Sequence, residues 1–298
     1  MNNKVSVIIP TYKSGDTLTR AIDSVLNQTY QFVEVIVVDD NNPDTEDRKR
    51  TEQLMDKYSQ NERVIYMQHE RNKNGSAARN TAFRNSSGVY IAFLDDDDYF
   101  LPQKLEHQVK FLESHKEYGA CYCWRRNHNG IEVCGNLSGD FSYELLALIF
   151  TPYTSAIMMR RECFVKLNGF DESYIRHQDF EFLLRFFKFY SMGYVPQIDL
   201  VLSKNGINNT PKGKKLVDVK KRFFAQFIDL INEITKDSAK KKRVIYANHF
   251  AATFKDLIRY GYPLLALMVY IKYGIKGGLY FWKTFFRLCT NGIKERLH

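Results

Sequence analysis

The first two hundred residues alternate between two hydrophobic patterns. Short runs of β-branched and apolar residues indicate strands, and segments with an apolar residue at every third or fourth position indicate helices. In chain order the predicted elements are strand Val5–Pro10, helix Thr17–Asn27, strand Phe32–Asp39, helix Asp44–Gln60, strand Val64–Gln68, helix Ser76–Asn85 and strand Tyr90–Asp95. The run Val35–Val38 is apolar at every position, which is typical of a strand covered on both faces. We therefore predict an α/β fold with a wound, mainly parallel sheet and helices on both faces.

The pattern becomes less regular after the next predicted helix, which begins at Pro102. The further predicted elements are strands Ala120–Arg126 and Ile131–Cys134, helix Tyr143–Ile149, strand Ser155–Arg160, helix Asp179–Tyr190 and an extended segment Tyr194–Ser203. Residues 204–215 contain Gly, Asn and Pro and are typical of a linker. Mostly helical patterns follow. We predict an α/β domain over residues 1–203 and a linker with a helical region over residues 204–298.

Charge distinguishes these two parts of the chain. Residues 1–203 contain 23 Lys and Arg against 28 Asp and Glu, whereas residues 204–298 contain 20 against 6 and carry a net charge of +14. The basic tail also holds the aromatic residues Tyr260, Tyr262, Tyr270, Tyr273, Tyr280, Phe281, Trp282, Phe285 and Phe286. This mixture favours contact with the headgroups of an anionic membrane face. Packing of the aromatic stripe on the α/β domain and binding of nucleic acid are the alternatives, and we expect no nucleic-acid partner.

Composition limits the class of protein further. Hydrophobic residues make up 44% of the 298 residues, enough for a buried core. The longest nearly uninterrupted apolar run, Tyr262 to Ile271, is about half the length that crosses a bilayer. The N-terminus lacks the pattern of an export signal, so we expect a cytosolic protein. Five cysteines without a CxxC pair indicate reduced thiols rather than disulfides or structural zinc.

Polar residues follow three of the predicted strands at their carboxyl ends, where wound parallel sheets bind ligands. These are Pro10-Thr11-Tyr12, Asp39-Asp40-Asn41-Asn42 and Asp95-Asp96-Asp97-Asp98. Four consecutive carboxylates repel one another unless a cation intervenes. Oxygen ligands select Mg²⁺ or Mn²⁺, and these ions usually share their ligands with a bound phosphate. A nucleotide diphosphate is therefore implied, although Asp98 alone is also explained as a charge near the start of the following helix.

With these residues assembled, the sequence resembles family 2 of the glycosyltransferases, the inverting enzymes with a nucleotide-binding GT-A fold. The resemblance covers roughly the first 200 residues in the order of the family. It is carried by the three strand ends together with Asn74-Gly75-Ser76-Ala77-Ala78-Arg79-Asn80, Pro102-Gln103-Lys104-Leu105, Asn168-Gly169-Phe170-Asp171 and Gln178-Asp179-Phe180-Glu181. It implies a GT-A, Rossmann-like fold and a transferase of the hexosyltransferase type, as found in bacterial polysaccharide assembly.

The resemblance also implies which residues bind the nucleotide. The loop Pro10-Thr11-Tyr12 and the carboxylate of Asp39 would hold the base, and a carboxylate favours uridine because it accepts the N3–H of uracil. Asn74, Gly75 and Arg79 would lie beside the base and the phosphates, where a guanidinium offers fixed donors. Arg79 is explained equally well by an ion pair with an aspartate at the end of the sheet.

The acidic run resembles the DxD motif of the family. Asp97 would be the direct metal ligand, with Asp95 as its partner, and Asp95 or Asp96 would reach the ribose. The extra aspartate at position 96 blurs this register. The implied cofactor is Mn²⁺ or Mg²⁺.

Asp179 resembles the catalytic base of the family, which takes the proton from the acceptor hydroxyl. An ordinary aspartate has a pKa near 3.9 and needs burial or a neighbouring charge to become a stronger base. Asp179 also suits the N-cap of the helix that follows it. The family usually has Glu-Asp here, whereas this chain has Gln178-Asp179, and His177 is a substitute partner for the missing acid.

Several weaker candidates complete the sequence-based site. Thr154 and Ser155 are candidates for an acceptor pocket, and Trp124, Arg125 and Arg126 for contact with a sugar ring or a diphosphate. Lys204, Lys212, Lys214 and Lys215 are more simply explained as a solvated charge run.

We predict a metal-dependent, inverting glycosyltransferase. It moves a sugar from a nucleotide-diphosphate sugar, expected to be a UDP-sugar, to a hydroxyl of a glycan or lipid-linked glycan. We expect it to act peripherally at the inner face of the cell membrane, and the sequence leaves a homodimer open. The alternatives are a nucleotidyltransferase and an inactive protein that binds sugar nucleotides or membranes.

Overall fold

The computed structural model describes residues 3–203 and 211–294, and within it the chain forms two compact units. The first unit comprises Met1–Phe141 and Pro152–Ile207, and the second comprises Ser142–Thr151 and Asn208–His298. Of the predicted linker, Lys204 lies outside the described residues, whereas Lys214 and Lys215 open a helix. A boundary drawn as a single cut in the chain does not anticipate that residues 142–151 belong with the second unit.

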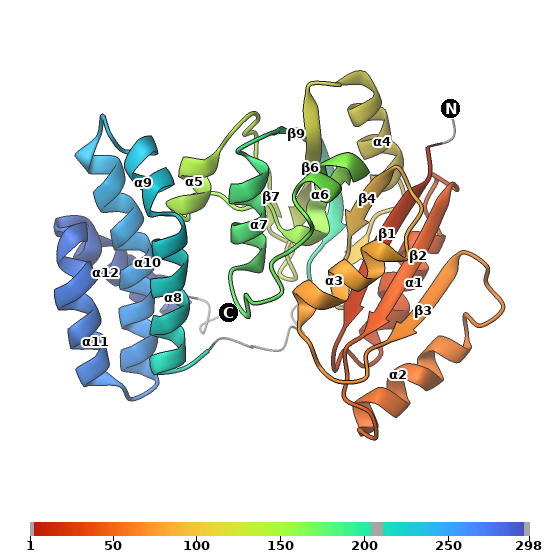
Figure 1. Cartoon of the computed structure of the whole chain (residues 1–298), viewed down its shortest axis with the longest axis horizontal. Helices are drawn as coiled ribbons and strands as arrows, with labels where there is room; N and C mark the ends of the chain where they lie inside the picture. The colour runs from red at the N-terminus through yellow and green to blue at the C-terminus, as the bar shows by residue number, and fades with distance from the viewer. Residues whose placement is uncertain (1–2, 204–210, 295–298) are drawn as a thin grey trace. The chain divides into compact units, whose positions relative to one another are not determined.

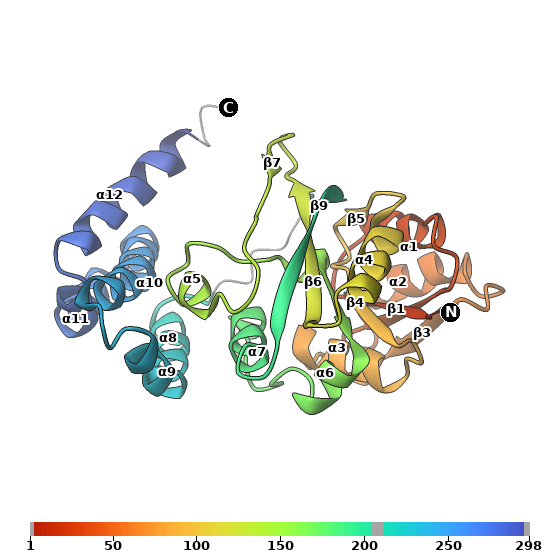
Figure 2. The same cartoon turned by 90° about the horizontal axis from the view of Figure 1, so that it is seen from above.

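The first unit is built on a nine-stranded mixed sheet with helices on both sides of it (Figures 1 and 2). The strands are β1 (Val5–Thr11), β2 (Val33–Asp39), β3 (Val64–Gln68), β4 (Tyr90–Phe93), β5 (Tyr99–Phe100), β6 (Tyr118–Arg126), β7 (Glu132–Val133), β8 (Ile157–Arg160) and β9 (Ser191–Val201). Their order is β3-β2-β1-β4-β8-β6-β9-β5, with β7 paired to β6. The pairs β1–β2, β1–β4, β2–β3 and β6–β9 are parallel. The predicted mixed, mainly parallel α/β fold is therefore confirmed.

The order of the strands places the switch point of the sheet at β1. The chain winds from β1 outward through β2 to β3 and then returns to the other side of β1 with β4. In wound sheets, ligands bind beyond the carboxyl ends of the strands at this switch. The ends of β1, β2 and β4 carry Thr11, Asp39 and the acidic run that starts at Asp95, as the sequence predicted.

Seven helices flank the strands of the first unit or follow them along the chain. They are α1 (Thr17–Leu26), α2 (Glu46–Asp56), α3 (Gly75–Arg84), α4 (Lys104–Ser114), a 3₁₀ turn (Thr154–Ala156), α6 (Arg161–Lys166) and α7 (Gln178–Phe186). Helix α1 buries Leu18, Ala21, Ile22 and Val25, which lie at helical spacing along one face. All seven residues of β2 are buried, Glu34 and Asp39 included, and the apolar run Val35–Val38 predicted a strand covered on both faces.

The second unit contains helices only among its described residues. They are α5 (Ser142–Leu146), α8 (Lys214–Gln226), α9 (Ile228–Ile234), α10 (Ala239–Arg259), α11 (Pro263–Val269), a π turn (Tyr270–Gly274), a 3₁₀ turn (Ile275–Gly277) and α12 (Leu279–Lys294). Figures 1 and 2 show α8 on one side of α10, with α11 and α12 on the opposite side of that helix. The predicted helical C-terminal region is confirmed.

Two polar side chains of α10 hold residues 142–151 within the second unit. Asn248 donates to the carbonyl of Ala147 at 2.6 Å, and the fully buried His249 lies with Nε2 2.9 Å from the carbonyl of Leu146. The other ring nitrogen, Nδ1, lies 3.0 Å from the Lys220 ammonium. Burial, reinforced by the charge of Lys220, lowers the pKa of His249 well below its usual value, so the ring is neutral and accepts this hydrogen bond.

Many of the tail aromatics pack against one another rather than facing outward. Phe250 and Tyr273 stack with ring centroids 4.5 Å apart, and Phe254 meets Phe281 and Phe285 edge to face. Phe281 is fully buried. The expectation that the whole aromatic stripe faces lipid headgroups is therefore wrong for Phe281, because its ring closes the core of the helical unit.

No single helix among the described residues is both long and apolar enough to cross a membrane. Residues Pro263–Gly277 and Leu279–Thr290 meet the length and composition requirements only as a pair, and they are bent by 116° where they meet.

Candidate active site

The loop after β1 is fastened to the acidic run after β4. The backbone N–H of Tyr12 donates to the Asp96 carboxylate at 3.1 Å, and the buried Thr11 hydroxyl bonds to Ser14 at 2.8 Å. Lys13 has a φ of 60°, and its N–H donates to the side chain of Asn41. The predicted loop 10–12 and Asp96 are therefore brought together at the switch point of the sheet.

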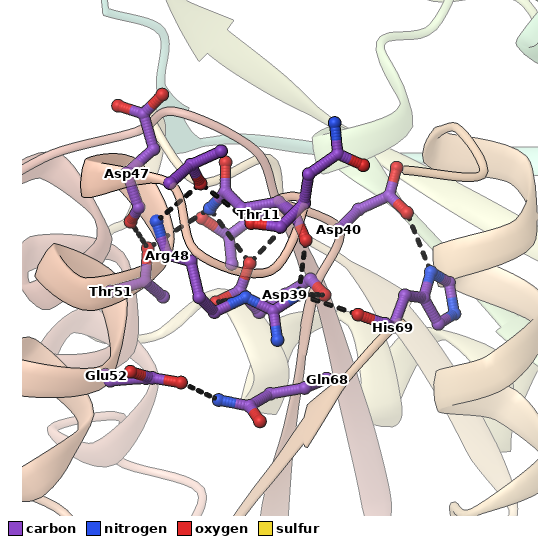
Figure 3. Close-up of polar contacts among 12 residues, drawn as sticks. Thr11, Asp39, Asp40, Asp47, Arg48, Thr51, Glu52, Gln68 and His69 are labelled. Atoms are coloured by element: carbon purple, nitrogen blue, oxygen red, sulfur yellow. Dashed lines mark hydrogen bonds and ion pairs between the residues drawn. The ribbon is translucent and has the colours of Figure 1, made fainter. Parts of the chain in front are cut away.

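Asp39 is fully buried, and protein groups surround both of its oxygens. Oδ1 accepts from the N–H and the side-chain amide of Asn41 at 2.9 and 2.8 Å, and Oδ2 accepts from the Tyr66 hydroxyl at 2.8 Å. The Arg48 guanidinium lies 3.2 Å from Oδ2 and also donates to the carbonyl of His69 at 2.8 Å (Figure 3). Burial raises the pKa of Asp39 despite these partners. The structure thus gives Asp39 the position predicted at the strand end, with its carboxylate engaged by protein donors.

Asp40, the next residue, has a role that the sequence analysis did not assign. Its buried carboxylate accepts from the backbone N–H groups of Lys73 and Asn74, both at 2.8 Å, from the Asn72 side chain at 2.9 Å and from His69 Nδ1 at 2.7 Å. Figure 3 shows Asp40 directed toward His69. One aspartate therefore fixes residues 72–74, the loop that leads into α3. Its position at the end of a predicted strand marked Asp40 as a candidate site residue. Its hydrogen-bond partners lie about thirty residues further along the chain, so the sequence did not show what it binds.

Asn74 caps helix α3. Its side-chain oxygen accepts from the N–H groups of Ser76 and Ala77 at 2.9 and 3.2 Å, which satisfies free donors of the first turn. Its φ is 99°, and its amide donates to the carbonyl of Glu172. A Cβ at Gly75 would lie 3.0 Å from Arg79 Nη1, so glycine leaves room for that guanidinium.

Arg79 links the end of β4 to the start of α7. Its Nη2 lies 2.6 Å from Asp95 Oδ1, and its Nη1 lies 3.5 Å from the side-chain oxygen of Gln178. The guanidinium also lies over the Phe170 ring at 5.6 Å. The side chain is 11% exposed, so little water competes for its donors. The ion pair with a sheet-end aspartate, left open by the sequence, is present.

The four aspartates after β4 have four different environments. Asp98 accepts from the Ser155 hydroxyl at 2.8 Å and from the N–H of Ser203, and Asp96 is bound to the loop after β1. Asp95 pairs with Arg79. Among the described residues, no side chain donates a hydrogen bond to the Asp97 carboxylate, which is stabilised by its own backbone N–H and by the charge of Arg20. Arg20 donates to the Asp97 backbone carbonyl at 2.6 Å.

Burial and mutual repulsion destabilise the ionised form of these aspartates. Burial, with the charges of Asp97 and Asp95, raises the pKa of Asp96 to about 7. Burial together with Asp95 and Asp97 raises the pKa of Asp98 to about 8, and the pKa of Asp97 is also raised. Excess negative charge of this kind favours a bound cation.

A divalent ion shared with a ligand fits these residues. Within residues 3–203 and 211–294, no three His, Cys, Asp or Glu side chains are arranged to hold a metal by themselves. Mg²⁺ commonly takes only one or two protein carboxylates and completes its shell with water and substrate phosphates. Asp97, and Asp95 on the oxygen not used by Arg79, offer that number of ligands.

Asp179 lies in the first turn of α7 beside an apolar cavity. The helix begins at Gln178, and His177, with a φ of 61°, is its N-cap, so the expected N-cap role of Asp179 is wrong. The cavity is lined by Phe93, Thr154, Ile157, Phe170, Asp179 and Phe182. Burial raises the pKa of Asp179, while hydrogen bonds from the backbone N–H groups of Phe180 and Asp179, and the charges of Arg79 and Arg176, oppose the shift. The apolar setting makes this carboxylate a stronger base than an exposed aspartate.

The weaker candidates divide between the cavity and other contacts. Thr154 lines the cavity, whereas the fully buried Ser155 donates to Asp98 and accepts from the N–H of Asp95. Arg125 lies 4.1 Å from the Tyr153 ring centre. Trp124 donates to the carbonyl of Gly135, and Arg126 pairs with Glu132, so these two serve the neighbouring hairpin.

Family models match most of the first unit and part of the second. The glycosyl transferase family 2 model matches residues 6–166, more than half of the chain, and the glycosyltransferase like family 2 model matches residues 136–250. The chain belongs to glycosyltransferase family 2. The resemblance and the enzyme class drawn from the sequence are confirmed.

Two relatives illustrate this membership. An uncharacterized glycosyltransferase of Methanocaldococcus jannaschii is 32% identical over 192 residues, which cover 61% of this chain and 63% of that protein. The UDP-Glc:alpha-D-GlcNAc-diphosphoundecaprenol beta-1,3-glucosyltransferase WfaP of Escherichia coli is 36% identical over 114 residues, 38% of this chain and 43% of WfaP. The chain thus spans less than two thirds of the length of either relative.

A solved structure shares the fold of the glycosyltransferase. Residues 1–349 of TarS from S. aureus, in complex with UDP-GlcNAc, align with a TM-score of 0.64 over 97% of this chain and 92% of that one. The sequence identity is 17%, so the match concerns the fold.

We predict that Asp40→Asn destabilises the enzyme by about 2–4 kcal/mol, because the amide leaves one or two buried donors unpaired. Urea denaturation at pH 7 measures this loss. Asp44→Asn, the same change at an exposed loop residue, should alter stability by less than about 0.5 kcal/mol. Equal stability of the two variants would show that Asp40 does not hold the loop before α3.

Proposed function

We propose that this glycosyltransferase moves a sugar from a UDP-sugar to a hydroxyl of a lipid-linked glycan, with inversion at the anomeric carbon and with Mg²⁺ or Mn²⁺ on the donor diphosphate. The observation that carries the proposal is the position of Arg79. Its guanidinium contacts Asp95 in the acidic run and Gln178, the residue before Asp179. One side chain therefore contacts both the acidic run, the predicted diphosphate site, and the residue next to Asp179, the predicted base.

The donor is inferred from the relatives and from the strand-end residues. WfaP is named for UDP-Glc, and TarS is solved with UDP-GlcNAc. In this chain, the loop 10–12, Asp39, Asn74, Gly75 and Arg79 gather at the same edge of the sheet. Because the Asp39 carboxylate is buried among protein donors, we propose that it shapes the base pocket together with Tyr66 and Arg48.

Asp97, assisted by Asp95, would hold the metal ion. A bound divalent ion would stabilise the negative charge that develops on the leaving diphosphate. The Asp98 carboxylate accepts hydrogen bonds from Ser155 and Ser203. Asp96 accepts one from the N–H of Tyr12, and contact of Asp95 or Asp96 with the ribose stays a prediction.

Asp179 would act on the acceptor. Its carboxylate takes the proton of the acceptor hydroxyl while the oxygen bonds to the anomeric carbon, and the bond from that carbon to the diphosphate oxygen breaks with its electron pair. The proton ends on Asp179, the diphosphate leaves as UDP, and a single displacement inverts the configuration. The apolar cavity excludes water and raises the pKa of the base toward the working pH.

The acceptor is inferred from WfaP, which is named for a GlcNAc-diphosphoundecaprenol acceptor. A lipid-linked acceptor is consistent with the predicted contact between the basic tail and an anionic membrane. Action at the inner face of the membrane and a homodimer stay predictions. Family membership favours sugar transfer over nucleotidyl transfer, and release of UDP rather than pyrophosphate separates the two reactions.

Asp97→Ala is expected to abolish transfer and to weaken Mn²⁺-dependent UDP binding at least about tenfold, because the carboxylate proposed to hold the metal ion is removed. Isothermal titration with UDP, with and without Mn²⁺, measures the effect. Glu46→Ala, which removes an exposed carboxylate on α2, is the control and should bind as the wild type does. Unchanged UDP affinity in Asp97→Ala with Mn²⁺ present would refute the metal role.

Asp179→Asn should lower kcat by about 100- to 10,000-fold and leave UDP binding nearly unchanged, since only the proton acceptor is lost. A base works when deprotonated, so the wild-type rate should fall as the pH drops through the raised pKa of Asp179. Gln178→Glu adds a negative neighbour and should move this fall to higher pH. UDP release from a panel of UDP-sugars and acceptors measures all three enzymes. A fully active Asp179→Asn enzyme would eliminate Asp179 as the base.

A further inference from the structure

The segment that runs through α11 and the two short turns after it has one buried and one exposed face. Ala266, Val269, Gly274 and Gly277 are buried, and a Cβ at Gly277 would lie 3.1 Å from the backbone of Ala247 in α10. The opposite face is apolar and open: Leu264 is 78% exposed, Leu267 53%, Met268 65%, Ile271 59% and Ile275 58%. Leu264, Met268, Ile271 and Ile275 recur every three or four residues, and Leu267 lies four residues before Ile271, so the five side chains fall along one stripe.

Helix α12 repeats this arrangement. Phe281 and Thr284 are buried, while Leu279 is 87% exposed, Phe286 61% and Trp282 36%. The spacing of Leu279, Trp282 and Phe286 again follows one side of a helix. We call the eight exposed side chains of these two stripes the apolar face. Isolated exposed apolar residues are ordinary, but sustained stripes on consecutive elements indicate a surface that is covered in use.

Along the chain, the charged residues in the segment that carries the apolar face are all basic. Between residues 257 and 294 the sequence contains six Lys and Arg and no Asp or Glu. Lys272, Lys276, Lys283 and Arg287 are exposed and alternate with the apolar face along the chain. Long basic side chains beside apolar ones are typical of helices that lie in the plane of a lipid surface, with their charges at the headgroups.

These charges distinguish between three possible partners of the apolar face: a second copy of the chain, nucleic acid and an anionic bilayer. A second copy would bring lysines against lysines, with no carboxylate in this stretch to pair with them. Nucleic acid would use the basic side chains but would leave aliphatic residues such as Leu264 and Met268 unused, since it rewards basic and stacking contacts. An anionic bilayer satisfies both kinds of side chain.

We propose that α11, α12 and the turns between them bind an anionic lipid surface through the apolar face, lying in the interface rather than crossing the bilayer. The bend of 116° between the two segments suits a membrane-surface hairpin better than a straight span. The purpose of this contact rests on the proposed function, transfer to a lipid-linked acceptor. The surface itself differs from the aromatic stripe expected from the sequence, because it is mainly aliphatic.

Sedimentation of the full-length enzyme with vesicles tests the proposal without donor or acceptor. We expect binding to phosphatidylcholine vesicles that contain phosphatidylglycerol and weak binding to pure phosphatidylcholine. Leu264→Ser/Met268→Ser should reduce binding to the anionic vesicles at least about tenfold by removing inserted apolar area. Lys272→Gln/Lys276→Gln should reduce it by about tenfold at low salt and less at high salt. Val165→Ser, at a similarly exposed residue of α6 in the first unit, is the matched control and should bind as the wild type does.

Tryptophan fluorescence tests insertion separately. The chain has two tryptophans, so Trp124→Phe leaves Trp282 as the single reporter on α12. Brominated acyl chains in the vesicles should quench Trp282, and unquenched fluorescence of the vesicle-bound enzyme would overturn insertion. Binding that is equal for all variants would overturn the proposed face. If the wild type dimerises without binding vesicles and Leu264→Ser/Met268→Ser abolishes the dimer, the face binds a second copy instead. Tight binding of duplex DNA at physiological salt would indicate nucleic acid instead.

The UDP-induced rise in melting temperature is measured for each variant as an independent readout. The tail variants should keep the wild-type shift, which also shows that they are folded. Vesicle binding without a UDP shift in the wild type would contradict the proposed function and leave the lipid surface standing. A UDP shift without vesicle binding would contradict only the lipid surface.

Discussion

Negative charge concentrated at the carboxyl edge of a parallel sheet is the constraint on which the site depends. Parallel strands that leave the core side by side bring their last residues together, and here these include Asp39, Asp40 and the four aspartates from Asp95. The protein stabilises each carboxylate differently, with buried hydrogen bonds at Asp40, with Arg48 at Asp39 and with Arg79 at Asp95. The Asp97 carboxylate is offset by its own backbone N–H and by the charge of Arg20, and we propose that an external cation binds there.

Arg79 connects the acidic run to the helix that contains Asp179. A charged guanidinium that is 11% exposed holds its partners firmly, because burial weakens competition from water. Its two contacts join the acidic run that follows β4 to α7, which contains Asp179. The family usually places an acid where this chain has Gln178. With a neutral partner there, the guanidinium has Asp95 as its ion-pair partner, and Asp179 lacks the negative neighbour that would strengthen it further. The apolar cavity supplies the increase in basicity instead.

Much of the first unit was predictable from local patterns, because buried strands and amphipathic helices report their surroundings. Strand β3 begins and ends at the predicted residues, and β2 differs by one. The helix expected from Asp44 begins later because Asp44 has a left-handed backbone and Thr45 caps the helix. Strand β5 was missed because its two residues are defined by pairing with β9, a hundred residues away. The partners of Asp40 and the burial of Phe281 depend on tertiary contacts, which no local pattern records.

The central claim is that Asp97 holds a divalent ion on the diphosphate of a bound UDP-sugar, with Asp179 facing the sugar. A crystal of the enzyme soaked with Mn²⁺ and UDP tests this most directly, because manganese is located by its anomalous scattering. The account predicts a manganese peak in contact with an Asp97 carboxylate oxygen and with a phosphate oxygen of UDP. A nucleotide bound at the strand ends with no metal beside Asp97 would contradict it.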